Sequence, residues 1–348
     1  MLKLFHEPTL LLPLLLFLLL FTVNVPLTLA YSNDRLRLRY PSLRTKTGNP
    51  ILDGWYADPE LRIFEKHYYL YPTYSAAFDQ QTFFEAFVSS DLVTWTPVGR
   101  ILDFVDVPWS NYSAAWAPSV GYKNGLYYLY FAAGNGVGIG VAVASSPAGP
   151  FRDALGKPLV GEYLYGAQPI DAMVFMDGPG PNGGSGEGRH YLYWGGRGHA
   201  VVAELAEDMV SFTGEFIEVT PEKEYVEGPW MLKRNGVYYF MYSVGNWTDN
   251  SYGVKYVKGN SPMGPFTRPS KLILTGDPNV ATSTGHNSVF NIGEDYYIVY
   301  HRRYWTDATR DHRVVCIDKM FFDEHGEINL VKITDEGVDG RNLSNSML

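Results

Sequence analysis

A short apolar pattern returns five times along the chain. Each copy is a strand-like run built around two adjacent aromatic residues or a close variant of such a pair, and it usually follows another short apolar run by about ten residues. The five aromatic runs lie at residues 68–71, 127–130, 191–194, 238–241 and 296–299. Clusters of Gly, Pro, Asn and Asp separate the runs, and no long stretch has helical periodicity. The pattern predicts an all-β protein of short strands.

The spacing of the copies favours a propeller over a sandwich or a barrel. Successive copies are 47 to 64 residues apart (238 − 191 and 191 − 127), which is enough for a four-stranded blade. Most copies are followed by a third apolar run and the start of a fourth. The turns at residues 146–151 and 261–266 have nearly the same sequence, which supports internal repetition. We therefore expect one domain, a five-bladed β-propeller over residues 49–335.

The N-terminus has the pattern of a secretory signal peptide over residues 1–30. Lys3 precedes a Leu-rich segment at residues 10–21, and small residues lead to a predicted cleavage before Tyr31. An uncleaved membrane anchor is the alternative, and Pro13 and Pro26 argue against it. Residues 31–48 are basic and predict an N-terminal arm, and residues 336–348 a C-terminal tail. We expect a secreted, extracellular protein without membrane attachment after signal cleavage.

Composition narrows the class of ligand. The chain has 28 Lys and Arg against 37 Asp and Glu, a net charge of −9, which argues against nucleic acid as a partner. Its 26 Tyr suit both strand packing and sugar stacking. Cys316 is the only cysteine and lies in an apolar run, so it predicts a buried structural thiol. Three sequons predict N-glycosylation at Asn111, Asn246 and Asn342.

The apolar run before each aromatic run carries the candidate chemistry. Four of these runs contain Asp58, Asp171, Glu227 or His286, and the second contains Trp116-Ala117-Pro118. The innermost strand of each blade lines the propeller axis, so these side chains would converge at one mouth of the channel. Two carboxylates on either side of a sugar can hydrolyse a glycosidic bond. A third carboxylate nearby can raise the pKa of the acid by like-charge repulsion.

Each of these residues also has a structural interpretation. Asp58 precedes Pro59 and could belong to a turn. An acid within an apolar run, such as Asp171, must be paired, hydrated or functional. Glu227 precedes Gly228, which lets a ligand approach closely. A single His286 is more often a hydrogen-bonded core histidine than a ligand.

Taken together and in order, five motifs resemble glycoside hydrolase family 43. The motifs are Ala57-Asp58-Pro59-Glu60, Trp116-Ala117-Pro118-Ser119-Val120, Gln168-Pro169-Ile170-Asp171, Val226-Glu227-Gly228-Pro229 and Gly285-His286-Asn287-Ser288. The resemblance implies a five-bladed propeller of inverting enzymes that act on arabinose- and xylose-containing glycans. It implies Asp58 as the general base, Glu227 as the general acid and Asp171 as the residue that modulates and orients the acid. It further implies that His286 corresponds to a histidine that binds a hydrated calcium ion in some members; no cofactor is expected to be required.

Candidate sugar-binding residues are an arginine and three tryptophans. Arg302 and Arg303 follow the last aromatic run and point to opposite faces of a strand. We favour Arg303 as the one that reaches the sugar or Asp58. Trp116, Trp55 and Trp230 are candidate stacking surfaces, with core packing as the alternative for each.

The leading functional hypothesis is a secreted, inverting exo-glycosidase that removes terminal α-L-arabinofuranosyl residues from plant cell-wall oligosaccharides or polysaccharides. A β-D-xylosidase, or one enzyme with both activities, is the nearest alternative. An endo-arabinanase would have an open groove in place of a pocket. A carbohydrate-binding propeller without catalysis is a different class, and the three acids argue against it. We expect a monomer.

Overall fold

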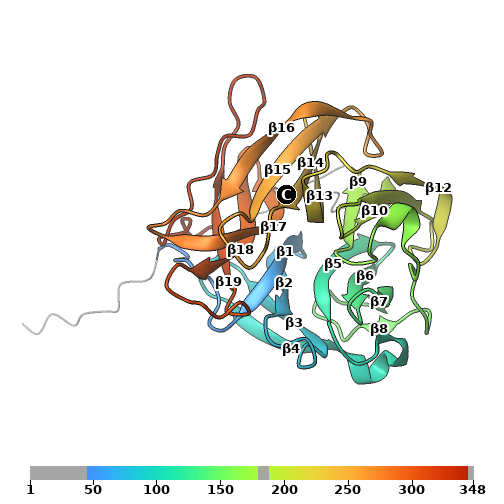
Figure 1. The fold of residues 1–348 in the computed structure, drawn as a ribbon. Coiled ribbons are helices and arrows are strands. Elements are labelled where there is room, and N and C mark those ends of the chain that lie inside the picture. Colours follow the sequence, from blue (N-terminus) through green and yellow to red (C-terminus); the bar gives the residue numbers. More distant parts are fainter. Residues whose placement is uncertain (1–44, 179–187, 344–348) are drawn as a thin grey trace, which may run out of the picture. The chain divides into compact units, whose positions relative to one another are not determined.

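The computed structural model describes residues 45–178 and 188–343. The signal peptide predicted for residues 1–30 and most of the arm predicted for residues 31–48 lie outside these residues. Within the described ranges, no helix has the length and hydropathy needed to cross a bilayer. The predicted fold is confirmed: five antiparallel sheets form a five-bladed β-propeller (Figure 1).

Four of the five blades are four-stranded sheets whose strands follow one another in sequence. The first has β1 (Tyr56–Phe64), β2 (His67–Tyr74), β3 (Phe83–Ser89) and β4 (Thr96–Asp103). The second has β5 (Trp116–Lys123), β6 (Leu126–Ala133), β7 (Gly138–Ala144) and β8 (Arg152–Asp153). The third has β9 (Met173–Asp177), β10 (Arg189–Trp194), β11 (Val201–Leu205) and β12 (Phe212–Glu218). The fourth has β13 (Tyr225–Arg234), β14 (Val237–Val244), β15 (Gly253–Gly259) and β16 (Phe266–Thr275).

The fifth blade has three strands in the described structure. They are β17 (Ala281–Ile292), β18 (Asp295–Tyr304) and β19 (Val314–Met320). Three short 3-10 helices lie in connections: η1 (Phe104–Asp106), η2 (Pro108–Ser110) and η3 (Leu164–Gly166). The five predicted aromatic runs all fall on second strands, β2, β6, β10, β14 and β18, as a repeated blade requires.

The core lies between neighbouring blades. The second strands are buried on both faces because each blade packs against a blade on either side; β2 and β6 are buried along nearly their whole length. Outer strands such as β12 are mostly exposed. One cluster of buried side chains combines Leu70 of the first blade with Val299 and Ile317 of the fifth. Cys316 is buried in this blade, which confirms the predicted structural thiol.

The innermost strands form a closed ring of contacts. β1 contacts β5 and β17, β9 contacts β5 and β13, and β13 contacts β17. A buried ion pair between Glu60 and Arg62 (2.8 Å) reinforces the ring. The Glu60 carboxylate also accepts hydrogen bonds from Ser119 and from the Val120 amide on β5, and Arg62 donates to the Val174 carbonyl on β9. One carboxylate and one guanidinium thus connect three blades near the axis.

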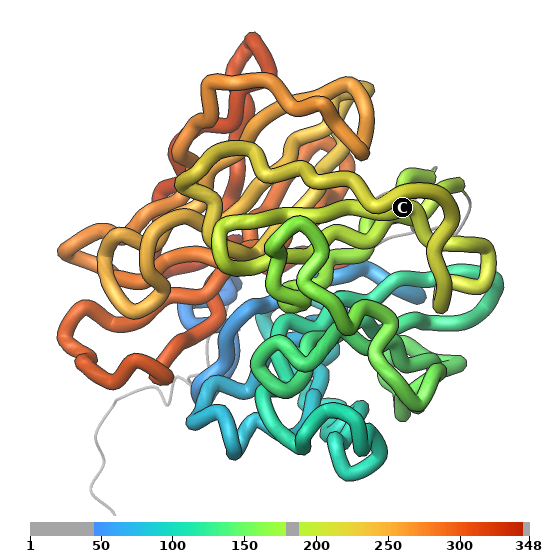
Figure 2. Tube along the Cα trace, turned by 45° about the vertical axis from the view of Figure 1, so that its right-hand side comes forward, coloured from blue at the N-terminus to red at the C-terminus, as the bar shows by residue number. Residues whose placement is uncertain are grey.

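The two ends of the described chain close the propeller without a covalent bond. The Thr47 amide donates to the Val338 carbonyl, and the Asn49 amide to that of Asp335. The Asn49 side chain exchanges two hydrogen bonds with the backbone of Ile317 on β19, much as a neighbouring strand would. The segments predicted as arm and tail therefore meet at this junction, where their described residues pair beside the fifth blade. Figure 2 traces the chain around the ring from the first blade (blue) to the fifth (orange to red), whose innermost strands β1 and β17 are in contact.

Candidate active site

One repeated backbone irregularity positions the candidate site. A residue near the start of each innermost strand has a left-handed φ: Asp58 (46°), Ala117 (44°), Asp171 (57°), Gly228 (64°) and His286 (46°). On four of the five strands this residue falls inside a shift of the strand register, as in a β-bulge. Bulges re-aim side chains and are common beside active sites, and left-handed non-glycine residues are costly unless their surroundings hold them in place. The irregularity turns these residues toward the axis.

Glu227 is not at the repeat position. Gly228 has the left-handed φ in the fourth blade, so Glu227 lies one residue earlier than Asp58, Asp171 and His286 do in theirs. The four predicted residues thus do not all occupy the same position in the repeat, and Glu227 is offset by one residue. A side chain at Gly228 would be strained by the left-handed φ and crowded, because its Cβ would lie 3.1 Å from Ser243 Oγ and 3.3 Å from His286 Cγ.

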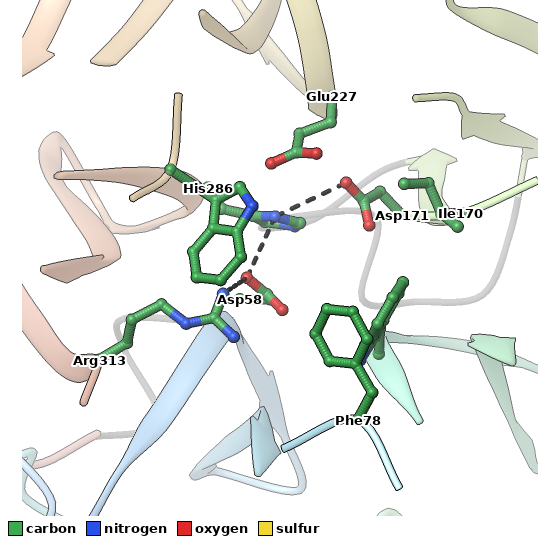
Figure 3. Close-up of a pocket in the computed structure, with 9 residues that line it drawn as sticks. Asp58, Phe78, Ile170, Asp171, Glu227, His286 and Arg313 are labelled. Atoms are coloured by element: carbon green, nitrogen blue, oxygen red, sulfur yellow. Dashed lines mark hydrogen bonds and ion pairs between the residues drawn. The ribbon is translucent and has the colours of Figure 1, made fainter. Parts of the chain in front are cut away.

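The three acids and His286 nevertheless come together. They line one pocket of about 440 Å³, counting space open to solvent, together with Phe78, Trp116, Ile170, Trp247 and Arg313. In Figure 3 the carboxylates of Asp58, Asp171 and Glu227 point toward the His286 ring. Its Nδ1 is 3.3 Å from Asp58 Oδ1 and 3.8 Å from Asp171 Oδ2.

Asp58 is surrounded by basic groups. Its side chain is almost fully buried, and its Oδ1 lies 3.4 Å from Arg313 Nη1 as well as 3.3 Å from His286 Nδ1. Burial alone would raise the pKa of Asp58, but the attraction of His286 and Arg313 outweighs it and holds the pKa well below its usual range. The lowered pKa favours the carboxylate form of Asp58, which is the form that a general base needs.

Asp171 and Glu227 have the opposite environment. Burial, and then repulsion from Glu227 and Asp58, raise the pKa of Asp171 well above its usual value. Burial also raises the pKa of Glu227, partly offset by His286 and by a hydrogen bond from Tyr252. Asp171 accepts a hydrogen bond from the Gly228 amide (3.0 Å), which ties it to the backbone beside Glu227. Asp171 and Glu227 therefore keep a proton between them at pH values at which Asp58 is already ionised.

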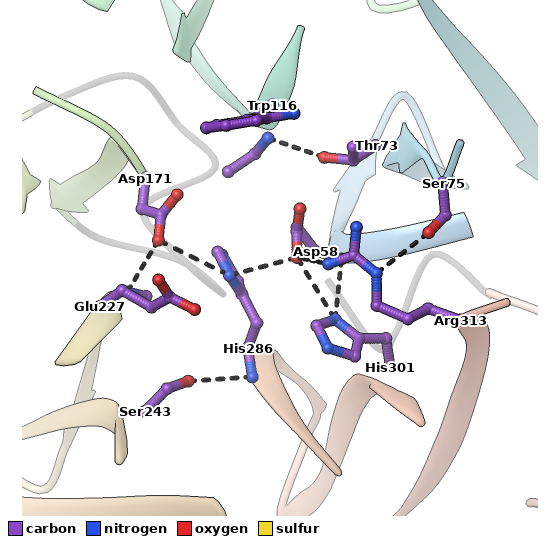
Figure 4. Close-up of polar contacts among 12 residues, drawn as sticks. Asp58, Thr73, Ser75, Trp116, Asp171, Glu227, Ser243, His286, His301 and Arg313 are labelled. Atoms are coloured by element: carbon purple, nitrogen blue, oxygen red, sulfur yellow. Dashed lines mark hydrogen bonds and ion pairs between the residues drawn. The ribbon is translucent and has the colours of Figure 1, made fainter. Parts of the chain in front are cut away.

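Figure 4 shows the polar contacts that hold this arrangement. The guanidinium of Arg313 donates to Ser75 (3.0 Å), and the His286 amide donates to Ser243 (3.0 Å). Thr73 accepts from the Ala117 amide (2.8 Å), which fixes the strand that carries Trp116. The supporting side chains thus come from the first, fourth and fifth blades.

Of the predicted sugar-binding residues, one lines the pocket and three lie elsewhere. Trp116 lines the pocket. Arg303 is buried and donates to the Thr248 carbonyl (2.8 Å), and the contact with Asp58 predicted for it is made by Arg313. Trp55 stacks on His312, with ring centroids 4.1 Å apart, outside the pocket. Trp230 lines a second cavity deeper along the axis, under the guanidinium of Arg62.

Four lining residues were not predicted from the sequence. Phe78, Trp247 and Arg313 come from loops, and Ile170 precedes Asp171. Arg313 stacks over the Trp247 ring (4.8 Å), and Arg310 over Phe78 (4.8 Å). The pocket lining therefore combines the acids with aromatic rings and a guanidinium, which suits a sugar ring.

The deeper cavity bears on the calcium ion predicted near His286. His286 and Asn287 line it, and Asn287 Oδ1 is a buried acceptor with no hydrogen-bond partner. No group of three His, Cys, Asp or Glu in the described residues could hold a metal directly. These residues fit only an ion that keeps most of its water ligands, held by His286 and Asn287. Calcium stays a prediction.

Comparison with known proteins places the chain among glycosidases. The family model for glycosyl hydrolases family 43 matches residues 47–328. A β-D-galactofuranosidase of Aspergillus niger, xynD, is 55% identical over 332 residues, which cover 92% of this chain and 95% of the relative. An arabinoxylan arabinofuranohydrolase of Bacillus subtilis is 31% identical over 72% of this chain and 55% of its own.

Solved structures agree. An α-L-arabinofuranosidase from Clostridium thermocellum superposes with a TM-score of 0.66 at 31% identity, covering 82% of this chain and 95% of that one. A thermostable family-43 glycoside hydrolase gives a TM-score of 0.70 at 27% identity, over 86% of this chain and 99% of the other. The family match spans most of the chain and includes every acid of the pocket, so this protein belongs to glycosyl hydrolases family 43.

Proposed function

We propose that this glycosidase is an inverting, exo-acting furanosidase that removes terminal β-D-galactofuranosyl residues, with terminal α-L-arabinofuranosyl residues as the second candidate substrate. The observation that carries the mechanism is the opposite perturbation of two acids in one pocket: the pKa of Asp58 is lowered and that of Glu227 is raised. The choice of sugar is supported by the galactofuranosidase that is 55% identical.

The two sugars are close in shape. β-D-Galactofuranose and α-L-arabinofuranose have the same configuration around the furanose ring, and galactofuranose carries one further exocyclic CH₂OH group. One pocket can therefore accept both rings, and the difference in rate must arise where the exocyclic arm lies. The arabinofuranosidases among the relatives keep the second candidate open. Xylose, a pyranose in xylans, differs in ring size.

The proposed reaction uses one water molecule, one carboxylate that accepts a proton and one carboxylic acid that donates a proton. The Asp58 carboxylate takes a proton from water as the water oxygen bonds to the anomeric carbon. The glycosidic C–O bond breaks on the opposite face, and its oxygen takes the proton of Glu227. The products are an alcohol and a free sugar of inverted configuration. Proton exchange with solvent then restores both acids.

A panel of 4-nitrophenyl glycosides tests this assignment. We expect release from the β-D-galactofuranoside and, more slowly, from the α-L-arabinofuranoside. Proton NMR at the earliest times is expected to show the α anomer of galactofuranose first. Release from the β-D-xylopyranoside alone would overturn the choice of sugar, and a first product of retained configuration would overturn inversion.

We expect kcat/KM to have a bell-shaped dependence on pH. Lowering the pH protonates Asp58 and removes the base, and because its pKa is lowered this loss should begin only below about pH 4. Raising the pH removes the shared proton of Glu227 and Asp171, and because both pKa values are raised this loss should begin above about pH 5. A profile from acid to mild alkali measures both limbs.

The variant Arg313→Met tests whether Asp58 sets the acid limb of the pH profile. It removes a cation from Asp58, so the pKa of Asp58 should rise and the acid limb should move to higher pH. Arg310→Met removes a neighbouring guanidinium that stacks on Phe78 instead, and it should leave the limb in place. Equal shifts in both variants would contradict the role given to Arg313.

We further propose secretion and N-glycosylation. The side chains of Asn111, Asn246 and Asn342 are all exposed, as the modification requires. A plant cell-wall polysaccharide as the natural partner and a monomeric state stay predictions from the sequence. Mass spectrometry of the secreted protein before and after enzymatic deglycosylation would test the three sites.

A further inference from the structure

We propose that Tyr252 and His301, which lie behind the pocket, are positioning residues that hold the acid and the base in a fixed relation. Tyr252 precedes β15 in the fourth blade and His301 lies on β18 in the fifth. Both side chains are fully buried, and neither lines the pocket. The inference rests on the roles proposed above for Glu227 and Asp58.

Each ring is bonded to one of the two groups. The Tyr252 hydroxyl donates to Oε1 of Glu227 (2.8 Å). His301 Nδ1 accepts the hydrogen bond of the Asp58 amide (3.1 Å) and lies 3.3 Å from the Asp58 carboxylate. The rings stack on each other, with centroids 5.7 Å apart and an interplanar angle of 13°. Glu227 is therefore held by one ring of a stacked pair and Asp58 by the other ring.

The neighbouring groups set the direction of these hydrogen bonds. The Ser243 hydroxyl accepts from the His286 amide, so its own proton is free for the oxygen of Tyr252, to which it is hydrogen-bonded. The Tyr252 proton then goes to Glu227 Oε1. When Glu227 is protonated, its proton must lie on Oε2, the oxygen left for the glycosidic bond. Tyr252 thus assigns the acid proton to one oxygen.

The imidazole of His301 is neutral in this arrangement. Burial lowers its pKa to about 4, and Nδ1 accepts from an amide, so the ring proton lies on Nε2. That Nε2 is buried and has no partner. A buried donor without an acceptor is costly, and such a cost is typical of groups retained for function.

The sequence leaves space for this pair. Gly285 lies opposite His301 in the register of β17 and β18. A Cβ at Gly285 would lie 2.2 Å from Cε1 of Tyr252, so only glycine lets the Tyr252 ring reach its place. The glycine before His286 therefore serves the ring behind the site.

Tyr252→Phe keeps the stacked ring and removes only the hydroxyl. We expect kcat to fall by about tenfold or more, with KM within about twofold, because a hydrogen bond to the carboxylate that forms as Glu227 gives up its proton is lost. The loss should be greater for alkyl aglycones than for 2,4-dinitrophenyl, which leaves without a proton. Tyr242→Phe is the matched control, because the buried Tyr242 donates to Glu222 Oε1 (2.9 Å) away from the pocket. It should change neither parameter.

A double variant separates positioning from general structure. In a Glu227→Gln background, adding Tyr252→Phe should cost little, because the proton it orients is gone. Full additivity, or equal losses for all leaving groups, would overturn the role of Tyr252. His301→Phe, which keeps a flat ring but cannot accept from the Asp58 amide, should lower kcat equally for all leaving groups; unchanged kcat would overturn the role of His301. If the wild-type enzyme cleaves a different glycoside, the same comparisons apply to that substrate, so failure of the sugar assignment is distinguishable.

Discussion

Asp58→Asn is expected to lower kcat/KM by about 10²- to 10⁴-fold, the usual contribution of a general base. An amide of the same shape cannot take a proton from water, so the attack on the anomeric carbon loses its driving group. The loss should be the same for good and poor leaving groups, because the base acts on the water and not on the aglycone. Initial rates on a series of aryl furanosides measure it.

Asp91→Asn is the control for this variant. Asp91 also has a lowered pKa, through hydrogen bonds from Thr94 and Val93 in a turn, although burial acts against it. It lies outside the pocket, so its replacement should leave kcat/KM unchanged. Circular dichroism and thermal melting would confirm that both variants fold. An Asp58→Asn enzyme that is folded and keeps a tenth of the activity would remove Asp58 from the role of base.

Glu227→Gln should give a loss of similar size, about 10²- to 10⁴-fold, but only where the leaving group needs a proton. Alkyl glycosides should lose most and 2,4-dinitrophenyl glycosides least, because a weakly basic phenolate departs unassisted. The alkaline limb of the pH profile should also disappear for activated substrates. Rates against the aglycone pKa for the wild type and the variant give this contrast directly.

Glu222→Gln controls for loss of a hydrogen-bonded carboxylate. Glu222 accepts from Tyr242 and Ser270 and pairs with Lys255 (3.2 Å) outside the pocket. It should show no dependence on the leaving group. If Glu227→Gln slowed all aglycones equally, the acid would have to be sought elsewhere, with Asp171 as the next candidate.

The blade repeat was predictable because it depends on local patterns. Alternating aromatic runs and turn residues recur in every blade, and a two-sided core requires them. The three acids were predictable for a related reason, since an ionisable group in an apolar innermost strand has few structural uses. The one-residue offset of Glu227 was visible in the spacing, where the step to Tyr238 is 11 and the other regular steps are 10. Only the backbone showed that Gly228 holds the repeat position.

Contacts between distant segments were not predictable. Arg303 lies on β18 and Arg313 directly precedes β19, each one residue beyond the last pair of this hairpin, Arg302 with Val314. The alternation of residues on the strand correctly predicted that an arginine at this end of the hairpin would approach Asp58. It could not show whether that arginine precedes or follows the connecting loop. Tyr252 and His301 carry no local signal, because their partners come from other blades. Trp247 was hidden within a sequon whose interpretation was a glycan site.

The junction of residues 47–49 with residues 335–338 has a consequence for protein synthesis. Asp58 emerges early from the ribosome, whereas His286, His301 and Arg313, which surround it, emerge near the end of translation. Until then the nascent chain carries a carboxylate with none of its basic neighbours. The base acquires its low pKa only when the last blade docks against the first. Hydrolytic competence is therefore the last property that the growing chain gains, and a chain shortened within the fifth blade would be inactive even with all three acids present.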